Sequence, residues 1–148
     1  MEKYKLTTDD IPPYDTISIM QKKDDNGRYF TEIINYPYDS DKNNILYEGF
    51  YDMGFLYSDE KYNVFLSGNN GLVKITKEGE SRETLVIIRD SFANPISPFL
   101  ALHYNLILID PRFYTKKVSE IVKSENAHAV LIIENMGSIA MQNMKINY

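Results

Sequence analysis

The feature that most constrains the fold is the apolar, largely β-branched run of residues 84–88, which gives way to polar residues at positions 89–91 and then to Asn94-Pro95. A continuous run of this kind is typical of a strand buried on both faces of a parallel sheet. An Asn-Pro pair is typical of the start of a helix. Ser91 therefore falls between the end of a buried strand and the start of a helix. At this edge of the sheet the first backbone N–H groups of the helix have no partner within the helix. A nucleophile would occupy such a position.

Length and composition fit one globular domain over residues 1–148. The chain has 148 residues, of which 43% are hydrophobic, enough for one sizeable core and too few for two domains. Its formal net charge is −5 and its basic residues are dispersed, so a sequence-independent nucleic-acid surface is not expected. The lack of cysteine excludes disulfides, thiolate metal sites and cysteine nucleophiles. We expect neither a metal nor another cofactor.

The sequence contains no segment that is expected to cross a membrane. No stretch approaches the ~20 consecutive apolar residues of a membrane-spanning helix. Residues 1–10 lack the apolar segment of a signal peptide. As written, the chain is expected to be soluble and not exported.

The first half of the chain is expected to be rich in β-strands. Residues 16–21 and 28–35 flank the turn signal of residues 24–27 and predict a hairpin. The 12 tyrosines of the chain, concentrated in this half, fit either half-buried strands or a face that stacks on sugar rings. Further strands are expected over residues 45–51, 62–66 and 72–76.

From residue 83 onward the pattern alternates between strand and helix. Strands are expected over residues 84–88, 106–109 and 129–133, with helices over 95–104 and 115–124 and a final helix from 136. Right-handed crossovers make the three strands parallel. The predicted fold class is therefore α/β, a β-rich N-terminal half followed by a β-α-β-α-β parallel unit.

The polar residues that follow the three parallel strands are expected to share one edge of the sheet, the usual ligand-binding edge of such folds. A structural reading stays open for two of them, because Asn94 is also a good helix cap and Asp110-Pro111 is a common turn. The converging residues are Asp90, Ser91, Asn94, Asp110, Arg112, Glu134 and Asn135.

Ser91 lacks an obvious base. A serine hydroxyl becomes a good nucleophile when a neighbouring group, usually histidine, takes its proton. Of the two histidines, His103 lies near the far end of the helix that follows Ser91, on the order of 12 Å away or more. His128 precedes the third parallel strand and so lies at the opposite edge, roughly 17 Å away. Neither is expected to be the base.

Several blocks resemble the carboxyl-terminal part of the DHHW family, bacterial surface-associated proteins of the wider SGNH-hydrolase-like group, which includes alginate O-acetyltransferase-like enzymes. The resemblance runs from about Tyr14 to the end of the chain and implies a partial SGNH-hydrolase-like fold, a flavodoxin-like arrangement of three layers. The blocks that carry it are residues 48–52, 59–75, 85–100, 103–104 and 109–114.

The resemblance also implies roles for individual residues. Ser91 matches the nucleophile, and its own N–H would form part of an oxyanion hole. Gly68 would supply a second backbone donor and Asn69 a side-chain amide donor. Asp90, Asn94, Asn70 and Arg112 are the expected substrate-binding residues, for an acylated glycan or a small acyl ester.

The chain departs from the family pattern where the acid–base pair should be. The Asp-x-His-Trp motif that supplies this pair is absent, and the chain has no tryptophan. Ser67 replaces a glycine of the family block, and Asn70 stands where members often carry histidine. The chain is therefore expected to correspond to the carboxyl-terminal portion of a DHHW-like domain with an incomplete triad.

Two functions remain open from the sequence. The first is a domain related to esterases and O-acetyltransferases of cell-surface polysaccharide, inactive alone, which hydrolyses p-nitrophenyl acetate no faster than a Ser91→Ala variant. The second is a non-catalytic module that binds carbohydrate or protein. Self-association or a complementing chain is expected, because apolar surface would otherwise be uncovered. The resemblance implies a cell-surface or extracellular location.

Overall fold

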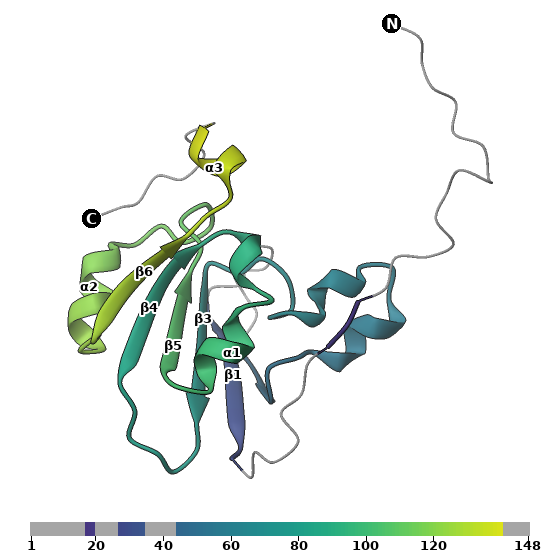
Figure 1. Cartoon of the computed structure of the whole chain (residues 1–148), viewed down its shortest axis with the longest axis horizontal. Coiled ribbons are helices and arrows are strands. Elements are labelled where there is room, and N and C mark those ends of the chain that lie inside the picture. The colour runs from purple at the N-terminus through teal and green to yellow at the C-terminus, as the bar shows by residue number, and fades with distance from the viewer. Residues whose placement is uncertain (1–16, 20–26, 35–43, 141–148) are drawn as a thin grey trace, which may run out of the picture.

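The computed structural model is built around one mixed sheet of six strands in the order β2-β1-β3-β5-β4-β6 (Figure 1). It describes residues 17–19, 27–34 and 44–140. The strands are β1 (Tyr29–Ile34), β2 (Ile45–Glu48), β3 (Leu72–Lys77), β4 (Thr84–Arg89), β5 (Asn105–Ile109) and β6 (Ala129–Ile133). The α-helices are α1 (Ser97–Ala101), α2 (Val118–Ser124) and α3 (Met136–Ala140), and the 3₁₀ helices are η2 (Met53–Tyr57), η3 (Lys61–Val64) and η4 (Ser91–Ala93).

The second half forms the predicted β-α-β-α-β unit. β4 lies between β5 and β6 and runs parallel to both, with Leu85 aligned with Leu106 on one side and with Ala129 on the other. Five of the six residues of β4 are buried, as expected for the central strand of such a unit. β3 pairs antiparallel with β5, and β1 and β2 extend the sheet antiparallel from there.

Two hydrophobic clusters cover the two faces of the sheet and give the fold three layers. Alternate residues of β4 divide between them, because successive side chains of a strand point to opposite faces. Leu85 and Ile87 pack with Ala101 of α1. Val86 and Ile88 pack with Val118 of α2. The predicted α/β class is confirmed.

Two predicted strands of the first half are wrong. Residues 17–19, the described part of the first hairpin strand, form no strand. β1 has β2 on one side and β3 on the other, so it offers no free edge to a hairpin partner. Residues 62–66 mostly form η3, and Phe65 makes only an isolated bridge to Tyr51.

Other helix and strand boundaries differ from the predicted ones because of local backbone geometry. β2 ends at Glu48 because Gly49 adopts a left-handed φ of 93°. Of the helix expected over residues 95–104, only the five residues of α1 form an α-helix, and the separate 3₁₀ helix η4 precedes that range. Asn94 is helical and follows η4, so it does not cap α1 as predicted. Among the described residues, no helix has the length and apolar character needed to cross a membrane.

Candidate functional site

Ser91 lies at the junction predicted for it, between the end of β4 and the start of η4. It is half-buried, not packed in the core. Its carbonyl accepts from the Asn94 N–H at 3.1 Å and from the Tyr62 hydroxyl at 2.7 Å. No hydrogen bond within the described residues uses its N–H or its hydroxyl. Both donors therefore stay available at the carboxyl edge of the sheet.

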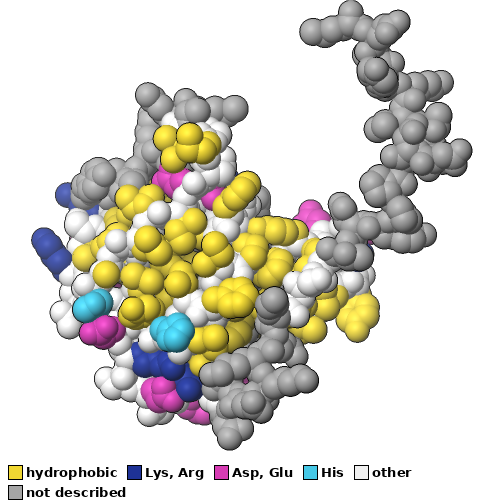
Figure 2. Space-filling view, viewed as in Figure 1, with side chains coloured by type: hydrophobic (Ala, Val, Ile, Leu, Met, Phe, Trp, Pro, Cys, Tyr) yellow, Lys and Arg dark blue, Asp and Glu magenta, His cyan; other side chains and the backbone are white. Residues whose placement is uncertain are grey.

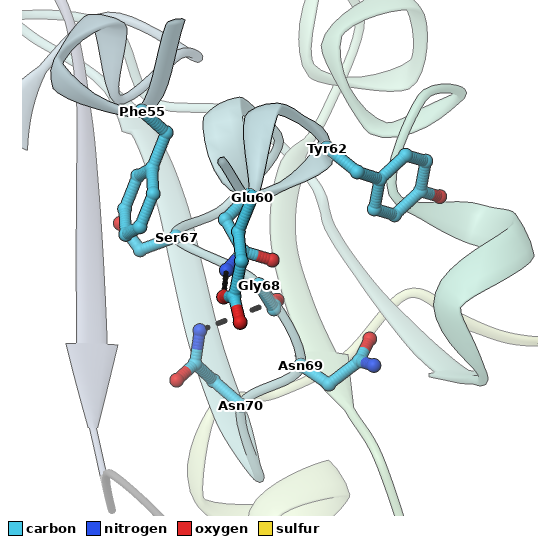
Figure 3. Close-up of a pocket in the computed structure, with 8 residues that line it drawn as sticks. Phe55, Glu60, Tyr62, Ser67, Gly68, Asn69 and Asn70 are labelled. Atoms are coloured by element: carbon cyan, nitrogen blue, oxygen red, sulfur yellow. Dashed lines mark hydrogen bonds between the residues drawn. The ribbon is translucent and has the colours of Figure 1, made fainter. Parts of the chain in front are cut away.

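Two hydrogen bonds join this edge to η3 and to the loop of residues 67–71 that follows it. One is the Tyr62–Ser91 bond, and the other runs from the Arg89 Nη2 to the Asn70 carbonyl at 3.2 Å. Figure 3 shows Tyr62 and Asn69 directing their side chains to the same side, whereas Asn70 turns away from it. The loop expected to supply oxyanion donors therefore lies beside the end of the serine's strand.

The loop and η3 line a hollow of about 740 Å³ (Figure 3). Polar side chains dominate its wall, and Tyr62 belongs both to this wall and to the Ser91 contact. Tyr62 thus connects the wall of the hollow to Ser91, which does not itself line it, and the hollow offers hydrogen-bonding groups to a polar ligand. Its lining residues are Phe55, Glu60, Tyr62, Asn63, Ser67, Gly68, Asn69 and Asn70.

The loop residues differ in which of their hydrogen-bonding groups are already used within the chain. The Gly68 N–H donates to the Phe65 carbonyl at 3.1 Å, so the expected oxyanion donor of Gly68 is already engaged. Asn70 is 1% exposed, and its amide donates to the Leu66 carbonyl at 2.7 Å, which makes it a support of the loop. Asn69 is different, because its Oδ1 is buried without a hydrogen-bond partner among the described residues.

Three consecutive residues at the start of this loop and directly before it adopt left-handed backbone conformations. The φ angles are 58° at Leu66, 53° at Ser67 and 93° at Gly68. Such conformations cost energy in non-glycine residues and concentrate at functional sites.

We expect Gly68→Ala to lower the free energy of unfolding by about 1–3 kcal/mol. A Cβ at Gly68 would lie 2.9 Å from the Asn63 Oδ1, whereas a Cβ at Gly79, with a comparable φ of 73°, would meet nothing within 4 Å. Gly79→Ala is therefore the matched control for backbone strain alone, and urea denaturation gives both values. Equal losses in the two variants would show that contact with Asn63 does not matter.

Asp90 ties the serine's strand to the segment after β6. It is fully buried, and its carboxylate accepts from the Phe92 N–H at 2.9 Å and from the Asn135 N–H at 2.9 Å, as well as from the Asn135 side-chain amide. The predicted convergence of residues after β4 and β6 therefore holds. The carboxylate has a structural duty, and its role in substrate binding stays a prediction.

Arg89, Asp110 and Arg112 form a charged cluster next to the site, and the first two of them are buried. The Arg89 side chain is 0% exposed, and its Nη1 lies 3.6 Å from the Asp110 Oδ2. Asp110 also accepts two bonds from the Arg112 guanidinium, at 2.9 and 2.6 Å, and one from the Arg112 N–H at 3.1 Å. Burial lowers the pKa of Arg89 to about 10, and the charge of Asp110 offsets part of that effect. These contacts favour a structural role for Asp110 in the turn after β5 over a role in ligand binding.

Arg112 and Asn94 are both expected to bind substrate, but they differ in how accessible their side chains are. The Arg112 side chain is 30% exposed and is held by Asp110. Asn94 is fully buried, and neither atom of its amide has a partner among the described residues. A substrate would have to enter the packed layer to contact Asn94. Glu134, the remaining edge carboxylate, has its pKa raised by burial and by Asp90 and Asp110.

Both histidines lie at the edge of the sheet opposite Ser91. His103 stands two residues before β5, and the His128 N–H donates to Thr84 at the start of β4. Figure 2 shows both rings on the part of the surface away from α3. The expectation that neither serves Ser91 within one chain agrees with this geometry. No group of three metal-ligating side chains occurs in the described part of the chain.

Sequence reasoning missed Tyr62 and Arg89 as the residues that hold the site together. Tyr62 was assigned to a strand because it belongs to an apolar run. A signal existed for Arg89, since an arginine that directly continues a buried strand must pair with a carboxylate. Asp110, at the same position after the neighbouring strand, was the natural candidate.

The fold and this edge define an α/β protein that presents a serine beside a loop of left-handed residues. No family model and no curated protein matches the sequence. Its structure is similar to the crystal structure of a DHHW family protein from Eubacterium siraeum DSM 15702, with 16% identity and a TM-score of 0.61 over 82% of this chain and 42% of that one. The predicted DHHW-like fold is thereby confirmed.

PatB1 of Bacillus cereus has the same fold. The structure of PatB1 with a sulfonyl adduct gives 18% identity and a TM-score of 0.56, over 75% of this chain and 37% of that one. A second PatB1 structure gives 18% identity and a TM-score of 0.55, over 75% and 36%. The chain therefore spans less than half the length of each of these proteins.

Proposed function

We propose that this chain is the nucleophile-bearing part of an acyl-transferring domain, an esterase or O-acyltransferase of the SGNH-hydrolase-like group, in which Ser91 takes up the acyl group. The observation that carries the proposal is the placement of Ser91, whose hydroxyl and N–H have no partner among the described residues at the carboxyl edge of the sheet. An N–H at the start of a helical turn is a good donor for an oxyanion.

The neighbouring loop supports the same chemistry. Asn69 is the candidate for the second oxyanion donor, because it lines the hollow and no hydrogen bond among the described residues uses its Nδ2. The sulfonyl adduct of PatB1 adds support from a protein of like fold, since sulfonylating reagents react with nucleophilic side chains. The acyl donor or acceptor fits the polar hollow, and an acylated cell-surface glycan is the class we favour.

A single copy of the chain has no imidazole near Ser91, so added imidazole is the direct test. Dilute wild-type protein is treated with phenylmethylsulfonyl fluoride at increasing imidazole concentration, and the modified residue is mapped by mass spectrometry. We expect sulfonylation of Ser91 that rises with imidazole and is abolished by Ser91→Ala. Ser81→Ala, at an exposed serine before β4, is the control and should change nothing. Equal labelling of wild type and Ser91→Ala would refute the proposal.

A non-catalytic sugar-binding module is the second candidate. Tyr57 on η2 is 94% exposed and Tyr62 is 42% exposed, and exposed aromatic rings can stack on sugars. Calorimetric titration with glycan fragments separates the two functions. Binding that is lost in Tyr57→Ala, combined with an unreactive Ser91, would favour the module over the acyl-transferring domain.

A further inference from the structure

The outer edge of β6 is apolar, and no strand in the described part of the chain pairs with it. β6 ends the sheet, so its outer side pairs with no described strand. Its sequence is Ala-Val-Leu-Ile-Ile without a charge, and Val130, Leu131 and Ile132 are 47%, 38% and 57% exposed. Figure 2 shows hydrophobic side chains gathered where Figure 1 shows β4, β6 and α1. An uncharged edge with apolar residues on both faces is a template for pairing with another strand.

The opposite edge of the sheet is protected in the usual way. β2 is only four residues long. Its Glu48 forms an ion pair at 3.0 Å with Arg28, the residue directly before β1. Leu46 is 65% exposed there, but the charged Glu32 of β1 lies directly opposite it. Short length and charge prevent edge pairing. The two edges therefore differ in the feature that decides whether a strand can be added.

We propose that a second copy of this chain pairs with β6 antiparallel, about a two-fold axis at Leu131. The backbone supports this register. The His128 N–H donates to β4, and the backbone of a strand alternates in direction, so Ala129 and Leu131 present their N–H and C=O groups to the free edge. Centring on Leu131 sets each of the five residues of β6 opposite a residue of its copy, with the Ile133 carbonyl also accepting from the Asp90 N–H at 3.2 Å within its own chain.

The charges at the two ends of β6 are complementary in this register. His128 precedes the strand and Glu134 follows it, so each His128 comes to lie opposite a Glu134 of the other copy. In the single chain, His128 pairs with Glu83 at 3.2 Å, with side chains 56% and 61% exposed. Such an exposed pair contributes little stability. His128 can therefore exchange Glu83 for Glu134.

The pairing carries a histidine to the serine's edge of the sheet. Arg89 is aligned with Ile133, so Glu134 lies beside Asp90, the residue before Ser91. His128 of the second copy then lies two strand spacings, about 10 Å, from Asp90. Within one chain the same histidine lies a full strand length, roughly 17 Å, from that edge. The side chains of His128 and Ser91, with a hydrogen bond between them, can together span the shorter distance.

The dimer would complete the site, an inference that rests on the proposed function of Ser91. The imidazole of His128 from the second copy takes the proton of the Ser91 hydroxyl as Oγ bonds to the acyl carbon. The bond from that carbon to the leaving alcohol breaks, and the alcohol takes the proton from the imidazolium. Glu134 orients the imidazole. Water or a glycan hydroxyl then removes the acyl group by the same proton path.

Light scattering tests the dimer. We expect a concentration-dependent dimer for wild type and for Leu46→Lys, and a monomer for Leu131→Lys, with circular dichroism to verify that both variants fold. Hydrolysis of p-nitrophenyl acetate per chain should rise with concentration only where the dimer forms. A wild-type monomer at all concentrations, or a Leu131→Lys dimer, would overturn the proposal in favour of a different occupant of β6.

Mixing two inactive variants tests the contribution of His128. A heterodimer of Ser91→Ala with His128→Ala contains one intact site, so an equal mixture should recover about one quarter of wild-type activity. No recovery, with both variants dimeric, would overturn the role of His128. Imidazole-dependent sulfonylation of Ser91 in monomeric Leu131→Lys separates the two ideas, because it persists if only the dimer is wrong and is absent if Ser91 is no nucleophile.

Discussion

Asp110→Ala is expected to lower the free energy of unfolding by about 3–5 kcal/mol, because it leaves a buried guanidinium without its counter-ion. Arg89 has no exposed surface, and neither its Nε nor its Nη1 has a hydrogen-bond partner among the described residues. Asp110 also neutralises Arg112, so its loss leaves two like charges facing each other. Chemical denaturation monitored by circular dichroism measures the loss.

A double-mutant cycle decides whether the lost ion pair is the cause. Arg89→Met combined with Asp110→Ala removes both charges of the buried pair and should recover much of the stability, because no unpaired charge is then left in the buried position of Arg89. Glu48→Ala breaks the exposed pair with Arg28 and is the matched control, with no measurable loss expected. A double variant no more stable than Asp110→Ala would contradict this account.

Asn69→Ala is expected to slow imidazole-dependent modification of Ser91 by about 10²–10³-fold, the usual effect of removing one oxyanion donor. Asn69 is half-buried and its Oδ1 makes no bond to the described residues, so removing the amide should leave stability nearly unchanged. The rate of sulfonylation at Ser91, followed by mass spectrometry, measures the effect.

Asn63→Ala is the matched control for Asn69. Asn63 lines the same hollow, but its amide donates to the Glu60 carboxylate at 2.6 Å and so is not available to a ligand. We expect its modification rate to stay within a few-fold of wild type. Similar rates for both variants would show that Ser91 reacts without help from the loop, and that Asn69 has a structural role only.

The parallel half of the fold could be predicted because its signals are local and continuous. The apolar run before Ser91 is long enough for one buried strand, and handedness then fixes the order and direction of the strands beside it. The edge shared by Asp90 and Asn135 follows from that topology alone. The prediction of residues 62–66 as a strand was wrong for a related reason, since a short apolar run fits a strand and a buried 3₁₀ turn equally well.

The sequence by itself determined the α/β class, the place of Ser91 and the distance of both histidines from it, because strand length and chain direction set these. Only the tertiary structure decided which groups are free: the Gly68 N–H is engaged, the Asn70 amide holds its own loop, and the amide of Asn69 faces the hollow. Hydrogen-bond partners come from residues far apart in the chain, and no local pattern records them. The position of β6 at the end of the sheet of described strands is likewise a property of the assembled sheet.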